Sequence, residues 1–379
     1  MKGFSGSRHL GSCGSLNGLL ALGACVAAGL LFSVPAVANY GGELRELYRG
    51  ARMTGMGGAF VAIADDEQAI WVNPAGLAGI QKTAFHYAVA DVEFSNDIAS
   101  EILSGMPTLQ ALGSGNLGAV IGKNIYGRVQ ITPTLVMPGW GIGFISDHQF
   151  GAILKNRVFP NTTVAMQSTN GVQIAQSFTL TRKGRRRGPG AGELRVGFAA
   201  KALWRRGGYN AIPMTQLLNL STDYILALGG TYGFGFGLDL GTQYVRSIGN
   251  NTQVSLGVAY TDIGDIAFSN GADTQKGNLS AGVGLTYKAT GFDFTLAADY
   301  RHINEDTDAR KRIHAGFEFA LPLIKVYGGL SQTLPEYGAA VDIWILRVTA
   351  LTYTEARGQT LGQDDERRWL TRLDAKFAF

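Results

Sequence analysis

Strict alternation of apolar and polar or small side chains runs through the stretch Leu194-Arg195-Val196-Gly197-Phe198-Ala199-Ala200-Lys201-Ala202-Leu203-Trp204. One face carries Leu194, Val196, Phe198, Ala200, Ala202 and Trp204, and the other carries Arg195, Gly197, Ala199, Lys201 and Leu203. Successive side chains of a β-strand point to opposite faces, so this period of two predicts a strand with one continuous apolar face.

The same period recurs along the rest of the chain, most clearly in residues 251–262, 277–289, 291–303 and 310–321. The second face of these stretches is mostly Gly, Ala, Ser and Thr with isolated charges. A soluble β-sandwich also alternates, but it buries its apolar face. A small and polar second face favours a transmembrane antiparallel β-barrel, in which that face lines a lumen and the apolar face meets lipid.

The alternation predicts about 14 strands, an even number as is usual in bacterial barrels. They lie near residues 83–92, 123–136, 139–153, 170–183, 192–206, 232–247, 251–262, 277–289, 291–303, 310–321, 323–332, 337–344, 346–356 and 366–379. In residues 346–356 the phase slips at Ala350-Leu351, which predicts a bulge.

Connections alternate between short and long, as periplasmic turns and extracellular loops do in such barrels. Short ones are predicted at residues 247–251, 289–291 and 321–323, and long ones at residues 93–122, 154–169, 207–231, 263–276 and 304–309. Short helices are predicted within residues 97–112 and 213–219. The basic cluster at residues 182–190 falls in a periplasmic turn. On the other side of the membrane it would be a lipopolysaccharide-binding patch.

Residues 1–38 have the pattern of a cleavable signal peptide. Lys2 and Arg8 precede an apolar run, and Pro35-Ala36-Val37-Ala38 supplies small residues for cleavage. A membrane anchor and a lipoprotein cut before Cys25 are the alternatives. We therefore predict export, with Asn39 as the first mature residue and the outer membrane of a Gram-negative bacterium as the destination.

Composition limits the function of the exported chain. Its only cysteines, Cys13 and Cys25, lie in the leader, which excludes disulfides and cysteine-based metal sites from residues 39–379. Without the leader, 31 basic and 29 acidic residues remain, a balance that does not predict nucleic-acid binding. We find no later apolar run of the roughly 20 residues that a transmembrane helix needs.

The last strand carries a second exported-barrel signal. Trp369, Thr371, Leu373, Ala375, Phe377 and Phe379 share one face. A terminal aromatic residue on such a strand resembles the signal that the barrel-assembly machinery reads, so Phe377 and Phe379 are predicted to form an assembly signal. That machinery, outer-membrane lipid and lipopolysaccharide are the partners expected of such a barrel.

The stretch between the leader and the first strand does not alternate. It includes Gly50-Ala51-Arg52-Met53-Thr54-Gly55-Met56-Gly57-Gly58-Ala59-Phe60-Val61-Ala62-Ile63-Ala64-Asp65-Asp66, followed by Asn73-Pro74-Ala75-Gly76-Leu77. This stretch resembles the N-terminal hatch of FadL-type outer-membrane channels and of their PorV-like and TraF-like relatives. The matching positions are Arg52, Gly55, Gly57, Gly58, Asp65, Asp66, Asn73, Pro74, Ala75 and Gly76.

The resemblance implies a barrel (residues 83–379) closed by a hatch (residues 39–82) inside its lumen. Irregular backbone cannot lie in lipid, but it can fold inside a lumen, where glycine allows close approach to the wall. Asn73-Pro74 is expected to start a turn, and Gly76 to leave it in a left-handed conformation. The implied function is passive uptake of small hydrophobic molecules such as fatty acids, through a lateral opening. A PorV-like accessory to protein secretion and a structural surface barrel without transport are the alternatives.

Candidate ligand-binding residues in the lumen are basic. Arg195, Lys201, Arg301, Arg347 and Arg372 could meet a carboxylate ligand, or they could pair with acids such as Asp239, Asp299, Glu318, Asp342 and Asp374. Asp65, Asp66 and Glu67 could bind a divalent cation or pair within the hatch. The scattered histidines predict no metal site, and no motif predicts catalysis or a cofactor. We therefore expect a protein that is not an enzyme.

Overall fold

A computed structural model describes residues 43–105, 122–155, 161–180, 192–213 and 230–379. The signal-peptide prediction and the basic cluster at residues 182–190 lie outside the described residues. Residues 39–379 belong to one compact unit, and the described strands and helices all lie within it.

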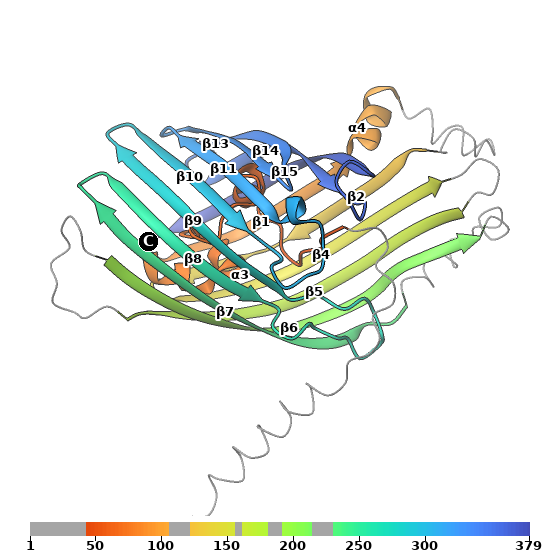
Figure 1. The fold of residues 1–379 in the computed structure, drawn as a ribbon, viewed down its shortest axis with the longest axis horizontal. Coiled ribbons are helices and arrows are strands. Elements are labelled where there is room, and N and C mark those ends of the chain that lie inside the picture. Colours follow the sequence, from red (N-terminus) through yellow and green to blue (C-terminus); the bar gives the residue numbers. More distant parts are fainter. Residues whose placement is uncertain (1–42, 106–121, 156–160, 181–191, 214–229) are drawn as a thin grey trace, which may run out of the picture. The chain divides into compact units, whose positions relative to one another are not determined.

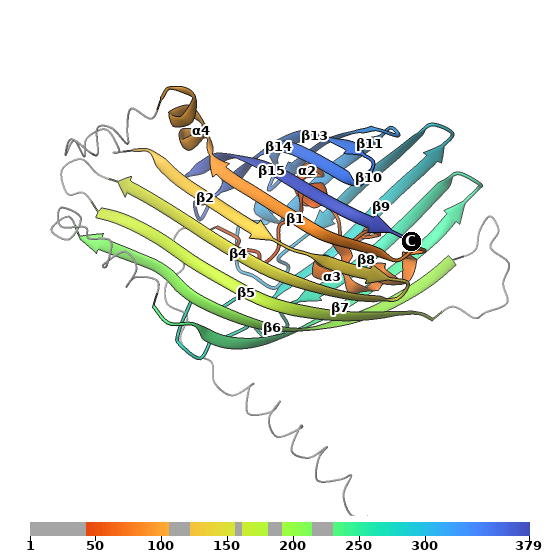
Figure 2. The same cartoon turned by 180° about the vertical axis from the view of Figure 1, so that it is seen from behind.

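The unit is an antiparallel sheet closed on itself (Figures 1 and 2). Its described strands are β1 (Ala84–Ser95), β2 (Asn124–Ile131), β3 (Thr134–Met137), β4 (Trp140–Lys155), β5 (Asn161–Thr179), β6 (Gly192–Pro213), β7 (Gly233–Ile248), β8 (Thr252–Thr261), β9 (Asn278–Ala289), β10 (Phe292–Tyr300), β11 (Ile313–Ala320), β12 (Ile324–Ser331), β13 (Leu334–Ile343), β14 (Leu346–Ala356) and β15 (Asp365–Ala378). β2 and β3 together occupy one place between β1 and β4, and β15 pairs with β1. The wall is therefore a closed barrel of 14 strands, as the alternation predicts.

The described connections differ between the two rims of the barrel. Turns of two or three residues join β3 to β4, β7 to β8, β9 to β10, β11 to β12 and β13 to β14 at the rim that also holds Phe379, here called the C-terminal rim. The longer connections at residues 262–277, 301–312 and 357–364 lie at the opposite rim, here called the loop rim. The β12–β13 connection is an exception, because its two residues, 332–333, form a short turn at the loop rim. The predicted alternation of short and long connections holds for the other connections named here.

The predicted loops at residues 154–169 and 207–231 are too long. β4 reaches Lys155, β5 starts at Asn161, and β6 continues to Pro213. These strands extend past the stretches with clear apolar alternation because backbone pairing continues beyond them, from Asn161↔Pro213 to Thr169↔Arg205. The wall therefore stands highest over β4, β5 and β6.

Side-chain exposure alternates along the strands as predicted. In β7, every second residue from Gly233 to Val245 is buried and the intervening ones are exposed. The apolar residues of the opening stretch, such as Phe198 and Trp204, point outward, while Lys201 and Leu203 point into the lumen. A continuous apolar outer surface of this kind suits contact with lipid.

The bulge predicted in residues 346–356 is wrong. β14 keeps one register with both β13 and β15 through Ala350 and Leu351. Leu351 faces inward and packs with Ala51, Tyr353 and Leu370, so an apolar residue on the lumen side disturbed the sequence pattern. The register shift instead lies in β1, between His86 and Ala88.

Helices are few and short. α2 (Ala51–Gly55), α3 (Ala69–Val72) and the 3-10 turn η1 (Pro74–Gly79) precede β1, α4 (Asn96–Leu103) follows it, and η3 (Ala309–Arg312) precedes β11. α4 confirms the helix predicted within residues 97–112, whereas residues 214–219 lie outside the described part. Among the described residues, no helix has the length and apolar character to cross a membrane.

Candidate functional site

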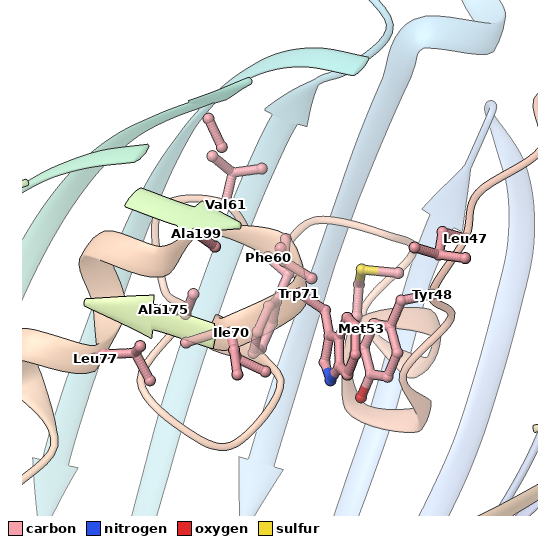
Figure 3. Packing of buried hydrophobic residues seen from close by; sticks show 14 of the residues in the cluster. Leu47, Tyr48, Met53, Phe60, Val61, Ile70, Trp71, Leu77, Ala175 and Ala199 are labelled. Atoms are coloured by element: carbon pink, nitrogen blue, oxygen red, sulfur yellow. The ribbon is translucent and has the colours of Figure 1, made fainter. Parts of the chain in front are cut away.

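The stretch before β1, residues 43–83, is here called the N-terminal segment. Its apolar side chains form the largest buried cluster together with inward-facing residues of the wall (Figure 3). Met56, Phe60 and Ile70 are completely buried. The rings of Tyr48 and Trp71 stack with centroids 5.5 Å apart. The apolar side chains of this segment thus pack against the inner wall of the barrel rather than against lipid.

Inward-facing glycines bring the wall close to the backbone of the N-terminal segment. A Cβ atom on Gly316 would lie 2.2 Å from the carbonyl oxygen of Met56, and one on Gly257 would lie 2.5 Å from that of Val61. Comparable clashes with the segment would arise at Gly143, Gly197, Gly241, Gly284 and Gly329. The absence of side chains at these positions makes room for the segment, because such short contacts exclude even alanine.

Arg52 joins the segment to the wall and to itself. Its Nε lies 2.8 Å from Glu318 on β11, and Nη1 lies 2.6 Å from Asp65 and 2.9 Å from Asp66. Burial would lower the pKa of the Arg52 guanidinium, but these three carboxylates raise it above its usual value. Arg52 is therefore a fixed positive charge at the centre of the motif.

The glycines of the motif serve two purposes. Gly57 and Gly58 adopt φ values of +67° and +78°, a region that side chains disfavour. Gly76 does not leave the turn in a left-handed conformation, so that prediction is wrong. A Cβ there would lie 2.1 Å from the carbonyl oxygen of Ala64, so glycine is needed for close approach.

Asn73 fixes the turn that follows. Its Oδ1 accepts a hydrogen bond from the amide of Ala75 at 3.2 Å, and its Nδ2 donates to the carbonyl oxygens of Val61 at 2.8 Å and Thr242 at 3.2 Å. Pro74 opens η1 at the position where a missing amide hydrogen matters least. The side chain of Asn73 thus ties the turn to the segment and to β7.

The start of the N-terminal segment meets residues near the loop rim. Glu43 pairs with Arg368 at 2.9 Å, Arg45 with Asp273 at 3.1 Å, and Glu46 with Arg301 at 2.6 Å. Burial raises the pKa of Glu43, but the stronger combined effect of Arg368 and Arg45 lowers it to about 2. These pairs join the segment to β15 and to the β8–β9 and β10–β11 connections.

The five basic residues predicted as ligand candidates all have partners within the protein. Lys201 lies 2.9 Å from Asp239 and 2.6 Å from Asp262. Arg301 pairs with Glu46, Arg372 with Glu67 at 3.2 Å, Arg195 with Glu193 at 2.9 Å, and Arg347 with Asp342. Two of the predicted acidic partners, Asp239 and Asp342, are in these pairs, while Glu318 binds Arg52 and Asp299 binds backbone amides.

Sequence reasoning missed a cluster of Glu67, His86 and Asp374. Nδ1 of His86 lies 2.8 Å from Asp374, and Nε2 lies 3.7 Å from Glu67. One ligand atom from each lies within 4.8 Å of the others, which is compatible with metal coordination. Arg372, 3.2 Å from Glu67, opposes a cation there electrostatically. No local pattern could reveal the cluster, because its members come from the N-terminal segment, β1 and β15.

Two cavities in the lumen are small, with linings that mix polar and apolar residues. One of about 40 Å³ is bordered by Glu46, Lys201 and Asp262, and another of about 30 Å³ by Arg49, Glu336 and Glu355. Volumes of this size admit only a few water molecules. Neither cavity has room for an organic molecule of the size of toluene.

The predicted assembly residues lie at the C-terminal rim. Phe377 points outward from β15 and its ring stacks on Tyr87 with centroids 5.7 Å apart. Phe379 is 79% exposed, and its amide donates to the carbonyl oxygen of Thr83 at 3.0 Å. The closing seam between β1 and β15 therefore ends on an exposed aromatic residue.

The chain has one match to a protein family in sequence and several matches to solved structures in fold. Residues 205–335 match a family of unknown function, DUF5723. No curated protein matches the chain in sequence.

Solved structures match nearly the whole barrel at low sequence identity. The Ralstonia pickettii toluene transporter TbuX aligns with a TM-score of 0.50 at 12% identity, over 87% of this chain and 98% of that one. The Pseudomonas putida toluene transporter TodX aligns with a TM-score of 0.44 at 12% identity, over 89% and 98%. A Pseudomonas aeruginosa FadL homologue aligns with a TM-score of 0.31 at 12% identity, over 89% and 99%. The likeness to TbuX, together with the closed 14-stranded wall, shows that this chain shares the barrel fold of TbuX.

Proposed function

We propose that the protein is a passive channel for small hydrophobic molecules in the outer membrane of a Gram-negative bacterium, with the N-terminal segment as its hatch. The observation that carries this proposal is the contact of that segment with the inner wall through glycines on seven strands, from β4 to β12. A segment that fills the lumen prevents free passage of water-soluble solutes. The fold shared with TbuX, a toluene transporter, agrees with a hydrophobic substrate.

A hydrophobic molecule needs a path other than the lumen, which the N-terminal segment occupies. The wall is irregular at one level near the C-terminal rim, where β2 ends at Ile131 and β3 begins at Thr134. Pro133 lies in this interruption and has no amide hydrogen to donate. The register shift of β1 between His86 and Ala88 lies opposite. This paired irregularity is our candidate for the lateral opening that the FadL resemblance implies.

A static barrel that docks a partner and transports nothing is the second candidate. The observation that favours it is the density of buried ion pairs between the N-terminal segment and the wall, including Arg49–Glu355 at 2.8 Å and Arg372–Glu67 at 3.2 Å. A hatch held by many such pairs opens only at a considerable free-energy cost.

Uptake measurements in a Gram-negative host that lacks its own hydrophobic channels separate these candidates. We expect the protein to increase uptake of radiolabelled toluene and octanoate, but not of glucose. Pro133→Val, which supplies an amide hydrogen at the wall irregularity, is expected to reduce that uptake. Pro335→Val is the matched control, because Pro335 lies in β13, away from the irregularity. Uptake no higher than in the empty host, with the barrel inserted, would leave only the docking candidate.

A further inference from the structure

A cavity with a mainly apolar lining lies on the outer face of the wall rather than in the lumen. It has a volume of about 490 Å³ and lies at the loop rim between α4 and the strands β1, β2, β4, β5 and β6. Its apolar lining includes Ile98 and Ile102 from α4, and Val92, Val129, Phe150 and Met166 from the wall. Figures 1 and 2 show α4 where β1 ends, at the same rim as β2 begins.

The helix that covers this cavity is firmly attached. Ser95 caps its N-terminus by accepting a hydrogen bond from the amide of Ile98 at 3.4 Å. Asn96 accepts one from the indole nitrogen of Trp369 at 3.3 Å, and Asp97 accepts one from the amide of Asn124 at 2.7 Å. α4 is therefore tied to β2 and β15 at its first turn, and the cavity is a formed part of the wall.

Three polar side chains lie beside the apolar part of the cavity. They belong to a row of cross-strand neighbours that begins with two of its apolar residues. The row runs through cross-strand neighbours on five strands: Val92, Val129, His148, Ser168 and Arg206. Its first two members are apolar and the last three are polar, although all five face outward. A polar group on the membrane face of a barrel is unexpected unless it meets a polar partner.

These polar side chains contact one another, but Arg206 among them has no acidic partner in the described part of the chain. Nδ1 of His148 lies 2.9 Å from the hydroxyl of Ser168, which lies 3.1 Å from that of Tyr232. The guanidinium of Arg206 lies over the Tyr232 ring, 4.9 Å from its centroid. Arg206 is exposed and forms no ion pair with any residue in the described part of the chain. It is an oriented cation, positioned by an aromatic ring and available to an anion.

The position of Arg206 relative to outward-facing aromatic residues indicates which kind of molecule could bind here. Trp204, Tyr232 and Trp369 point outward near the same rim, and outward aromatic residues mark the level of the lipid head groups. Arg206 lies two residues beyond Trp204 along β6, toward the rim. A ligand here would have its head group at Arg206 and its hydrocarbon under α4.

We propose that this outer cavity binds one phosphorylated, acylated lipid of the outer leaflet, a lipopolysaccharide molecule. An acyl chain would occupy the space under α4, and a phosphate would lie against Arg206 with hydrogen bonds from His148 or Tyr232. Arginine suits phosphate because its planar guanidinium donates two parallel hydrogen bonds. This site is independent of transport, and a docking barrel would have it as well.

Binding of purified lipopolysaccharide to the full protein in neutral-lipid nanodiscs tests the proposal. Arg206→Gln is expected to weaken binding about tenfold, the effect of losing one charge-assisted contact. Gly127→Leu is expected to weaken it as well, by filling the cavity. A Cβ on Gly127 finds its nearest neighbour 3.9 Å away, so this change leaves the wall intact.

Arg367→Gln is the matched control. Arg367 also lies over an exposed tyrosine, Tyr337, at 5.1 Å from the ring centroid, but it does not line the cavity. The Arg367→Gln variant should bind lipopolysaccharide as well as the unchanged protein does. Dephosphorylated lipopolysaccharide should bind the unchanged protein as weakly as the intact lipid binds Arg206→Gln. An equal loss in Arg206→Gln and Arg367→Gln would mean general charge attraction and overturn the proposal. Unchanged binding in Gly127→Leu, or equal binding of a neutral diacylglycerol, would overturn it too.

Discussion

Oδ2 of Asp299, on β10, lies 2.6 Å from the backbone amide nitrogen of Phe60, a residue 239 positions earlier in the chain. The same oxygen accepts from the amide of Val61 at 2.8 Å. A single buried carboxylate thus holds two successive amides of the N-terminal segment, in the middle of its glycine-rich motif.

Replacing Asp299 with alanine should loosen this part of the segment. Two buried amides would lose their acceptor, at about 1–3 kcal/mol for each. Hydrogen exchange at residues 59–64 should then accelerate at least about tenfold, the rate change that corresponds to 1.4 kcal/mol. Asp293→Ala is the matched control: it lies inward on the same strand and has no hydrogen bond to the segment among the described residues. Equal protection of residues 59–64 in both variants would show that Asp299 does not hold the segment.

Adding one methyl group to the wall should displace the segment as well. In Gly316→Ala the new Cβ would lie 2.2 Å from the carbonyl oxygen of Met56, a backbone atom that cannot move without the segment. We expect trypsin to cut after Arg52 faster in this variant, while the barrel stays folded. Gly151→Ala serves as the control, because its Cβ would meet Ala165 at an ordinary 3.5 Å. Identical cleavage of the two variants would argue against a role for the wall glycines.

The wall was predictable from sequence because exposure to lipid imposes a period of two on every strand. That reasoning failed where the lumen side is apolar, as at Leu351, whose partner Ala51 comes from the N-terminal segment. It also began β5 too late and ended β6 too early, because backbone pairing near the loop rim continues where the lipid-imposed alternation stops.

The motif residues of the segment were predictable, but their wall partners were not. Arg52 and Asn73 could be selected from the sequence, whereas Glu318, Asp299 and Gly316 carry no local signal that distinguishes them from other inward-facing residues. The cluster of Glu67, His86 and Asp374 likewise depends on the closing pair of β1 and β15. Such contacts are properties of the closed barrel rather than of any one stretch.

The contact between Glu46 and His302 should depend on pH. His302 lies in the β10–β11 connection, with Nδ1 2.8 Å from Glu305 and Nε2 3.2 Å from Glu46. Burial and the nearby Arg301 lower its pKa, but the two carboxylates raise it above its usual value. Burial raises the pKa of Glu46, yet Arg301 and His302 lower it overall.

The direction of the pH effect follows from these shifts. A histidine whose pKa is raised by folding stabilises the folded state fully below its unfolded pKa of about 6.5, and this contribution is lost as pH rises through the higher folded value. Glu46 stays ionised over that range. Hydrogen exchange near Glu46 should therefore accelerate as pH rises above about 6.5, beyond the intrinsic increase of the exchange rate itself, and His302→Gln should remove this extra dependence. Identical pH profiles for the unchanged protein and His302→Gln would contradict this expectation.

Deleting Phe379 should reduce insertion without changing export. The residue is exposed at the C-terminal rim and makes one backbone contact to Thr83, so its loss costs the folded barrel little. For the deletion we expect normal precursor processing with a several-fold lower inserted fraction. The variant Phe379→Trp, which keeps a terminal aromatic residue, should insert like the unchanged protein. Processing is followed by the size of the precursor, and insertion by the gel shift between boiled and unboiled samples. Full insertion of the shortened chain would remove the assembly role of this residue.

Removing residues 39–82 tests the hatch most directly. The lipid-facing strands remain, so the barrel should still insert. Its lumen would lose the apolar cluster around Phe60 and Ile70, and it would expose acids such as Glu318 and Asp299 that now face the segment. A barrel of this strand number is too wide for side chains alone to fill, so water and ions would enter.

Ion conductance in planar bilayers should therefore rise well above that of the intact protein. The double variant Asn73→Ala, Pro74→Ala should leak less than the deletion. It loses the three hydrogen bonds of the Asn73 side chain, but it keeps the chain in the lumen along with Arg52 and its ion pairs. A barrel shown to be folded that conducts no better after the deletion would mean that the lumen is blocked by other parts of the chain. The connection at residues 262–277, whose Ile266 and Phe268 are buried in the same cluster, would then be the next element to remove.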